Sequence, residues 1–444
     1  MRGATKKYVA AIAGSGLLFE GKNVGIEGIN YPRNYTASCS NEQQVADSGF
    51  FTQGDYKVKI RARPEGSAAK PKRDFSNFMI VSGTANTSLS NSVCKSLGTT
   101  VAPVDVTRFS DGEISCIINE SVRGKDAYLI QSFGSPSVND NIMELLLTIT
   151  ALRRAGANSI TAVIPYFGYK FHRNRGMPIS TTLQSRFLWN AAVDVAKMLQ
   201  VCGVDKVISV DLQRPGQNQE ATFFPGSVPV ETIDSNSLFV EYFSEGDIIR
   251  DGDHFVVLSP NTEFVKKAKR FQRKLQDSLG RKNIDATVAF AAYLDDEVND
   301  NEAQLLPGKS KIGVTLPKLQ GADALLGDVS GADVVIVDDI VESGLGISQL
   351  CRRLVRAGAR RVYVCASHGV FSRNTLELID LSMVEKVIVT DSLPLPKNVR
   401  VSNKIDQVSV APLLSKVIET ELFQHSNRGR TTVREEDDLL SEDD

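Results

Sequence analysis

Short apolar runs that end in small residues recur along the chain, and they constrain its fold more than any other feature. The first run, Phe78–Val81, ends in Ser82-Gly83-Thr84, and a helix-like stretch over residues 89–97 follows it. The same order returns at three further runs, 129–130, 162–164 and 207–210. Strands and helices that alternate in this way predict a mostly parallel sheet with helices on both faces.

A second series of apolar runs begins near Val228, and 444 residues are enough for more than one domain. Its runs are 255–258, 286–290, 334–337, 362–365 and 387–389. We therefore expect two tandem α/β domains, over residues 76–227 and 228–400, and a closing strand and helix over 401–425. Residues 1–75 are expected to form an N-terminal extension and the acid-rich residues 426–444 a tail.

Composition excludes two classes of partner. The formal net charge is -2, which gives no bulk electrostatic case for a nucleic-acid partner. The local basic cluster Lys266, Lys267, Lys269 and Arg270 is expected to form the solvated face of a helix. No apolar run reaches the roughly 18 residues that span a bilayer, so we expect no membrane partner.

The six cysteines show no metal-type spacing. Cys94, Cys202 and Cys351 lie in helix-like stretches, so free thiols in a reducing, cytoplasmic compartment are expected. At the N-terminus, basic residues precede an apolar stretch over 8–19, which loosely resembles a signal or transit peptide. Glycines and a serine interrupt that stretch, and a β-strand is the favoured interpretation.

Residues 334–348 are the most informative segment. An apolar strand leads into Asp338 and Asp339, then into a loop of small residues, then into a helix. In a parallel sheet such a loop lies at the carboxyl end of a strand, where free N–H groups of the following helix suit a phosphate. Gly344 and Gly346 would allow close backbone approach, and the aspartates could bind ribose hydroxyls or magnesium. The alternative is a plain strand-to-helix turn whose acids cap the helix.

This segment resembles the phosphoribosyl-binding loop of phosphoribosyltransferases and, more closely, that of phosphoribosyl pyrophosphate synthetase (ribose-phosphate diphosphokinase). Further segments resemble the same family in the same order: 108–113, 121–126, 138–146, 162–169, 178–180 and 367–372. The resemblance implies two phosphoribosyltransferase-like domains related by duplication. It also implies a reaction of nucleotide biosynthesis, in which the β,γ-diphosphate of ATP is transferred to C1 of ribose 5-phosphate with magnesium.

The resemblance further implies particular site residues. Those expected to bind the sugar phosphate are Asp338, Asp339, Glu342, Ser343, Gly344 and Gly346. Those expected to bind the nucleotide are Phe109, Asp111 and Glu113. Asp338 and Asp339 are also the candidate magnesium ligands. In the family ATP lies at a subunit boundary, so an oligomer is implied. By contrast, Asn139, Asp140 and Glu144 are expected to hold loops and subunit contacts, and His368 to be a packed structural histidine.

The departures from the family fall on the groups that would do the chemistry. A run that contacts ATP in the family reads Lys-Phe-His-Arg-Asn-Arg at 170–175, and a metal-binding histidine is replaced by Gln213. A Ser-Pro-Asp-x-Gly-Gly turn has lost its acid and both glycines at 259–264. The mobile loop that is basic in the family is acidic at 293–297, and it would repel a triphosphate. The candidates for relocated catalytic cations are Lys309, Lys311, Arg173 and Arg175.

Three hypotheses remain open. The favoured one is a non-catalytic or regulatory subunit, in a homo-oligomer or in a hetero-oligomer with an active paralogue, because several charged groups have changed together. Losing one such group typically costs ~10³-fold or more in rate. The second is a divergent but active diphosphokinase with relocated basic residues. The remote third, a ligand sensor on this fold, would usually carry a basic nucleic-acid module, for which the sequence gives no clear pattern.

Overall fold

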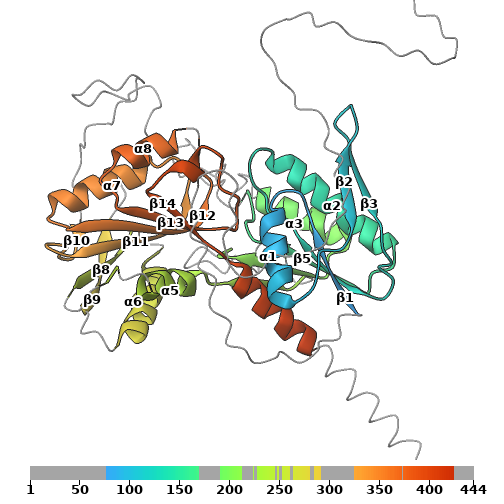
Figure 1. Ribbon diagram of the computed structural model, residues 1–444, viewed down its shortest axis with the longest axis horizontal. Coiled ribbons are helices and arrows are strands. Elements are labelled where there is room, and N and C mark those ends of the chain that lie inside the picture. The colour runs from blue at the N-terminus through green and yellow to red at the C-terminus, as the bar shows by residue number, and fades with distance from the viewer. Residues whose placement is uncertain are drawn as a thin grey trace, which may run out of the picture. The chain divides into compact units, whose positions relative to one another are not determined.

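The computed structural model describes residues 77–169, 191–212, 224, 228–245, 248–249, 253–260, 264–280, 285–291, 325–372 and 374–424. Within these ranges the chain forms two large sheets with flanking helices, one mostly blue and green and the other mostly yellow and orange in Figure 1, and a separate two-stranded hairpin. The predicted α/β fold class is therefore confirmed. Several sequence-based expectations concern residues outside the described ranges. These residues are 1–75, 170–175, 213, 261–263, 293–297, 309, 311 and 426–444.

The first sheet has five parallel strands in the order β1-β4-β5-β6-β7. They are β1 (Phe78–Ser82), β4 (Asp126–Ile130), β5 (Ser159–Ile164), β6 (Lys206–Val210) and β7 (Val230–Ile233). The accompanying helices are α1 (Thr87–Leu97), α2 (Val138–Arg154) and α3 (Ala191–Cys202). An antiparallel hairpin, β2 (Val104–Arg108) and β3 (Ile114–Ile118), leaves the sheet between α1 and β4. Since β7 follows residue 227, this sheet extends past the domain boundary expected there.

Side chains alternate between two cores on the faces of this sheet. Phe78 and Ile80 belong to a cluster with α1 and residues 411–424, whereas Met79 and Val81 belong to one with α2 and α3. Successive side chains of a strand point to opposite faces, so a strand covered on both faces must be apolar at every position. This is why the strand sequences read as continuous apolar runs.

The second sheet has seven strands in the order β10-β9-β8-β11-β12-β13-β14. They are β8 (His254–Ser259), β9 (Asp285–Ala291), β10 (Leu325–Leu326), β11 (Asp333–Val341), β12 (Arg361–Gly369), β13 (Lys386–Thr390) and β14 (Ile405–Val408). The other elements are α5 (Asn236–Glu245), α6 (Val265–Leu279), α7 (Leu345–Arg356), α8 (Thr375–Leu381) and η3 (Val399–Val401). Among the described strands of this sheet, only β9 and β10 pair antiparallel. One core holds α7 and α8, and the other holds α5 and α6 (Figure 1).

The two sheets share a pattern. In each, one run of five parallel strands places neighbours in chain order, β1-β4-β5-β6-β7 in the first and β8-β11-β12-β13-β14 in the second. The unit β11–α7–β12 therefore repeats β4–α2–β5. The loop after β11 and the loop after β4 then occupy equivalent places, each at the carboxyl end of a strand.

The last helix, residues 411–424, follows the second sheet in the chain but packs on the first. Val410, Leu414 and Ile418 are buried in the core that contains α1. The Asp391 carboxylate anchors the start of this helix, because it accepts hydrogen bonds from Val410 N at 2.7 Å and from Ser409 Oγ at 2.6 Å. None of the helices in the described part of the chain is long and apolar enough to span a membrane.

Candidate functional site

The loop between β11 and α7 is built around a glycine. Gly344 is the residue that caps the N-terminus of α7, and its φ of +69° is one that L side chains rarely adopt. A Cβ at this position would lie 3.1 Å from both Cγ2 and the carbonyl oxygen of Thr375. No side chain caps this end of α7, and Gly346 lies in its first turn. The unpaired N–H groups that begin a helix suit a phosphate.

A neighbouring segment holds this loop in place. The carbonyl oxygen of Glu342 accepts a hydrogen bond from Ser372 N at 2.8 Å and another from the Thr375 hydroxyl. The carbonyl of Val341 accepts from Val370 N at 2.9 Å. The Glu342 side chain is half-buried and Ser343 is exposed. Glu342, Ser343 and Gly344 thus lie on one fixed loop. Asp338 and Asp339 precede it within β11, and Gly346 follows it in the first turn of α7.

A cavity of about 350 Å³ adjoins the loop. Its lining includes Ile340 and Glu342 from the β11 side and the segment 133–136 from the equivalent loop after β4. Tyr169, the last described residue before the segment expected to contact ATP, also lines it. Ligand cavities in proteins are typically about 300–1,000 Å³, so this one is large enough for a sugar phosphate.

The two aspartates have different surroundings. Asp338 is half-buried, and burial raises its pKa to about 6, although the N–H of Asp339 donates to its Oδ1 at 2.7 Å. Asp339 is buried, and its Oδ1 accepts from Lys267 Nζ at 2.6 Å. Within the described residues, Asp339 Oδ2 has no hydrogen-bond partner. Asp338 therefore has the more accessible carboxylate, and Asp339 is already paired with a cation.

The expectation that the basic cluster in α6 is solvated is wrong for Lys267. Lys266, Lys269 and Arg270 are exposed, but Lys267 is only 2% exposed. It lies one residue before the buried Ala268, on the face of α6 that packs on the sheet. A lysine is seldom fully buried unless it is paired, and here Asp339 supplies the opposite charge.

Sequence reasoning also missed Asp211 as part of this site. Asp211 directly follows β6 and is buried, and its Oδ2 lies 3.6 Å from Lys267 Nζ. A usable signal was present, because an acid that ends a buried parallel strand lies at the same sheet edge as other strand-ending acids. Asp338 was recognised from that same pattern.

The predicted nucleotide-binding residues lie in the turn of the β2–β3 hairpin. The N–H of Phe109 donates to the carbonyl of Glu113 at 2.8 Å, and the N–H of Glu113 donates to Asp111 Oδ1 at 3.1 Å. All three are exposed, and Phe109 is 59% exposed. None of them lines the cavity beside the sugar-phosphate loop. The hairpin turn therefore presents a surface aromatic ring rather than a wall of that cavity.

Several other residues have the contacts expected of structural positions. The buried His368 ring lies 2.8 Å from Ser392 Oγ through Nδ1, and its centroid is 4.9 Å from that of Tyr166. The Glu144 carboxylate accepts from both the N–H and the hydroxyl of Thr84, each at 2.6 Å. These contacts hold the loops beside the sheets.

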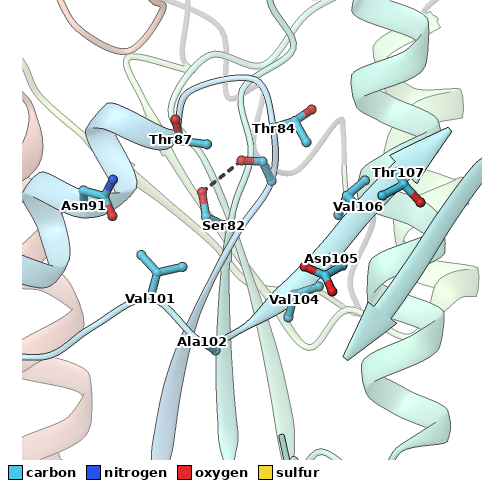
Figure 2. A pocket seen from close by; sticks show the side chains of 11 residues that line it. Ser82, Thr84, Thr87, Asn91, Val101, Ala102, Val104, Asp105, Val106 and Thr107 are labelled. Atoms are coloured by element: carbon cyan, nitrogen blue, oxygen red, sulfur yellow. Dashed lines mark hydrogen bonds between the residues drawn. The ribbon is translucent and has the colours of Figure 1, made fainter. Parts of the chain in front are cut away.

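Figure 2 shows a second cavity, of about 370 Å³, beside the loop that joins β1 to α1. This cavity is lined by the hydroxyl groups of Ser82, Thr84 and Thr87, by the carboxylate of Asp105 and by apolar residues around β2. No predicted site residue contributes to it.

Few residues beside the loop could hold a magnesium ion. Among the described ranges, no three His, Cys, Asp or Glu side chains form a group that could hold a metal ion. Magnesium bound beside phosphates commonly takes only one or two protein carboxylates and completes its shell with phosphate oxygens and water. Asp338 fits that requirement, since its carboxylate is half-buried beside the phosphate loop.

Parallel α/β domains and this loop together define a class of phosphoribosyl-binding proteins. The loop runs from an acid pair near the end of a strand to the open N-terminus of a helix. Residues 78–203 match the N-terminal domain of ribose phosphate pyrophosphokinase, and residues 256–427 match the phosphoribosyl synthetase-associated domain. The chain is 32% identical to ribose-phosphate pyrophosphokinase B of Dictyostelium discoideum, over 77% of this chain and 94% of that relative.

Two further comparisons agree. The ribose-phosphate pyrophosphokinase of Aquifex aeolicus is 32% identical, over 76% of this chain and 94% of its own length. The crystal structure of phosphoribosylpyrophosphate synthetase from Mycobacterium smegmatis is similar with a TM-score of 0.61 and 30% identity, over 78% of this chain and 99% of that one. The chain belongs to the ribose-phosphate pyrophosphokinase family.

Proposed function

We propose that this protein binds ribose 5-phosphate and ATP and serves as a non-catalytic or regulatory subunit of a ribose-phosphate pyrophosphokinase oligomer, together with an active paralogue. One contrast carries the proposal. The loop between β11 and α7 keeps Gly344 at the N-terminus of α7. By the family resemblance, however, Gln213 stands in place of a metal-binding histidine, and the loop at 293–297 is acidic where the family has a basic one. Such a chain would keep ligand binding and lose most of the rate.

In this proposal the first turn of α7 binds the 5-phosphate, and Asp338 accepts hydrogen bonds from the ribose hydroxyls. Asp338 would also hold magnesium, which when bound neutralises part of the phosphate charge. Asp339 stays paired with Lys267 and fixes the end of β11. Phe109, at the exposed hairpin turn, would contact a nucleotide held by a neighbouring subunit. A cytoplasmic location is also proposed, supported by the free thiols of Cys94, Cys351 and Cys365.

A divergent but active ribose-phosphate diphosphokinase is the second candidate. It is favoured by the match over nearly the full length of relatives that carry that name. Because transfer of a diphosphate depends on positioning and charge neutralisation, relocated cations could supply the missing charge. Lys309, Lys311, Arg173 and Arg175 are the proposed sources.

The deciding measurement is formation of phosphoribosyl pyrophosphate by the purified chain alone, given ATP, ribose 5-phosphate and magnesium. We expect a rate at least ~10³-fold below the roughly 1–100 s⁻¹ common in phosphoryl-transfer enzymes such as kinases. Calorimetry on the same preparation should still detect ribose 5-phosphate binding. An ordinary rate would overturn the regulatory proposal, and alanine variants of the four candidate cations would then locate the active ones. Failure to bind the sugar phosphate would contradict both candidates.

A further inference from the structure

A buried charged cluster lies beneath the sugar-phosphate loop and joins the two sheets. It consists of Lys267 from α6, Asp339 from β11, Ser367 from β12, and Asp211 and Ser235, which follow strands β6 and β7 of the first sheet. All five side chains are less than a tenth exposed. The cluster thus draws on both sheets, and it is separate from the exposed part of the loop.

Lys267 is at the centre of the cluster. Its ammonium group donates to Asp339 Oδ1 at 2.6 Å, to Ser367 Oγ at 2.9 Å and to the main-chain carbonyl of Asp338 at 3.1 Å. It lies 3.6 Å from Asp211 Oδ2. Three of these partners lie at carboxyl ends of β11 and β12, so one side chain fixes both the backbone of Asp338 and the side chain of Asp339.

Asp211 completes the cluster from the first sheet. Its Oδ2 accepts hydrogen bonds from the hydroxyls of Ser235 and Ser367, and its φ is +44°. Burial alone would raise its pKa, but Lys267 and the two hydroxyls outweigh burial and hold the pKa at about 2. The carboxylate is therefore charged and held in an unusual backbone conformation.

The charges are unequal. Two buried carboxylates lie within 4 Å of the same ammonium group, so the removal of Lys267 would take away a cation that both acids share. Buried ion pairs often add little to net stability compared with apolar residues of the same size, so stability alone gives a weak reason for this arrangement. Two of the contacts of Lys267 are with Asp338 and Asp339, which directly precede the proposed ligand loop.

We propose that Lys267 is a positioning residue that couples the end of β6 to the sugar-phosphate loop. It holds Asp339 away from the ligand and fixes the backbone that presents Asp338. A movement of the Asp211 segment, which leads to Gln213, then changes the affinity of the loop for ribose 5-phosphate. This inference rests on the proposed binding of ribose 5-phosphate at that loop.

The test uses calorimetric titration of the full chain with ribose 5-phosphate and magnesium. Lys267→Met should weaken binding at least tenfold, and Lys267→Arg should recover most of the affinity. Lys269→Met, the same change at an exposed position of the same helix, should bind like the unmodified chain. A folded Lys267→Met protein with unchanged affinity would overturn the inference.

Asp211→Asn gives an independent test if Lys267→Met does not fold. The amide keeps one oxygen that can accept from Ser235 and Ser367, removes the charge, and replaces the other carboxylate oxygen with an NH2 group. It should weaken sugar-phosphate binding at least threefold, although Asp211 belongs to the first sheet and is not a predicted ligand-binding residue. Unchanged affinity would show that the two sheets are not coupled here.

Hydrogen exchange separates this inference from the proposed function. In Asp211→Asn, amides of residues 338–346 should exchange faster than in the unmodified chain, whether or not a ligand binds. If the unmodified chain binds no ribose 5-phosphate, the proposed function fails. The exchange rates of this loop in the two proteins would still show whether Asp211 is coupled to it. Equal exchange in the two proteins would overturn it.

Discussion

At the residue scale, Gly344 allows a direct test of how the loop is built. Gly344→Ala introduces a methyl group 3.1 Å from two atoms of Thr375 and also a strained positive φ. Gly331 has nearly the same φ, +68°, but its Cβ direction is open. Gly331→Ala should therefore cost only the conformational term, about 1 kcal/mol. Gly344→Ala should lose more free energy of unfolding and also weaken sugar-phosphate binding.

Urea unfolding and calorimetric titration of both glycine variants make the comparison. The difference between the two variants isolates the close contact with Thr375, because the backbone penalty is common to both. Equal stability losses, with ribose 5-phosphate affinity retained in Gly344→Ala, would mean that the loop adjusts freely. The proposed phosphate site would then not depend on the geometry seen here.

Residue identity predicted some of this site and not the rest. Asp338 was recognisable because it follows a run of apolar residues, although in the structure β11 continues past it to Val341. Lys267 was not, because lysines at 266, 267 and 269 look alike in a sequence, and only the packing of α6 decides which one is buried. The partners that make that burial possible, Asp211 and Asp339, are 56 and 72 residues away by their numbering.

At the scale of elements, the strands were the most predictable part. The apolar runs at 334–337, 362–365 and 387–389 lie within β11, β12 and β13, since the middle of a buried parallel strand is mostly apolar. Which sheet an element joins was harder to predict. β7 and the helix at 411–424 both join the first sheet, through contacts that local sequence does not encode.

Asp391 gives a pH-dependent prediction for that helix. Burial raises its pKa to about 6, whereas an aspartate in an unfolded chain has a pKa of about 3.9. The folded state therefore holds more protons between these values, and stability falls as pH rises through this range. Asp391→Asn keeps an acceptor for Val410 N without the charge. Between pH 4 and pH 7, the unmodified chain should lose roughly 2 kcal/mol relative to this variant.

Urea unfolding at pH 4.5, 5.5 and 7.0 would measure this difference. Asp277→Asn, at an exposed position on α6, provides a matched control and should follow the unmodified chain at every pH. If Asp391→Asn and the unmodified chain gave parallel curves, the buried carboxylate would not be the source of the dependence.

At the scale of the whole molecule, residues far apart in the chain tie the two sheets together. Asn86 Nδ2 donates to the carbonyl of Asp391 at 2.7 Å, and Ser132 Oγ donates to the carbonyl of Ser392 at 2.6 Å. The cluster around Lys267 and the helix at 411–424 add to these links. The cavity beside the sugar-phosphate loop is lined from both sheets, so its shape depends on the same links.

These links predict that both sheets unfold together. Leu414 is fully buried against the first sheet, and Leu414→Ala should cost about 3 kcal/mol. Because the connection is shared, amides of β11 and β12 in the second sheet should lose exchange protection by the same factor as those of β4 and β5. Phe423→Ala, in the same helix but at a residue that is 68% exposed, should change stability by less than about 0.5 kcal/mol. Loss of exchange protection confined to the first sheet would mean that the two domains unfold independently. A ligand site lined by both domains would then lose one wall while the other wall remained folded.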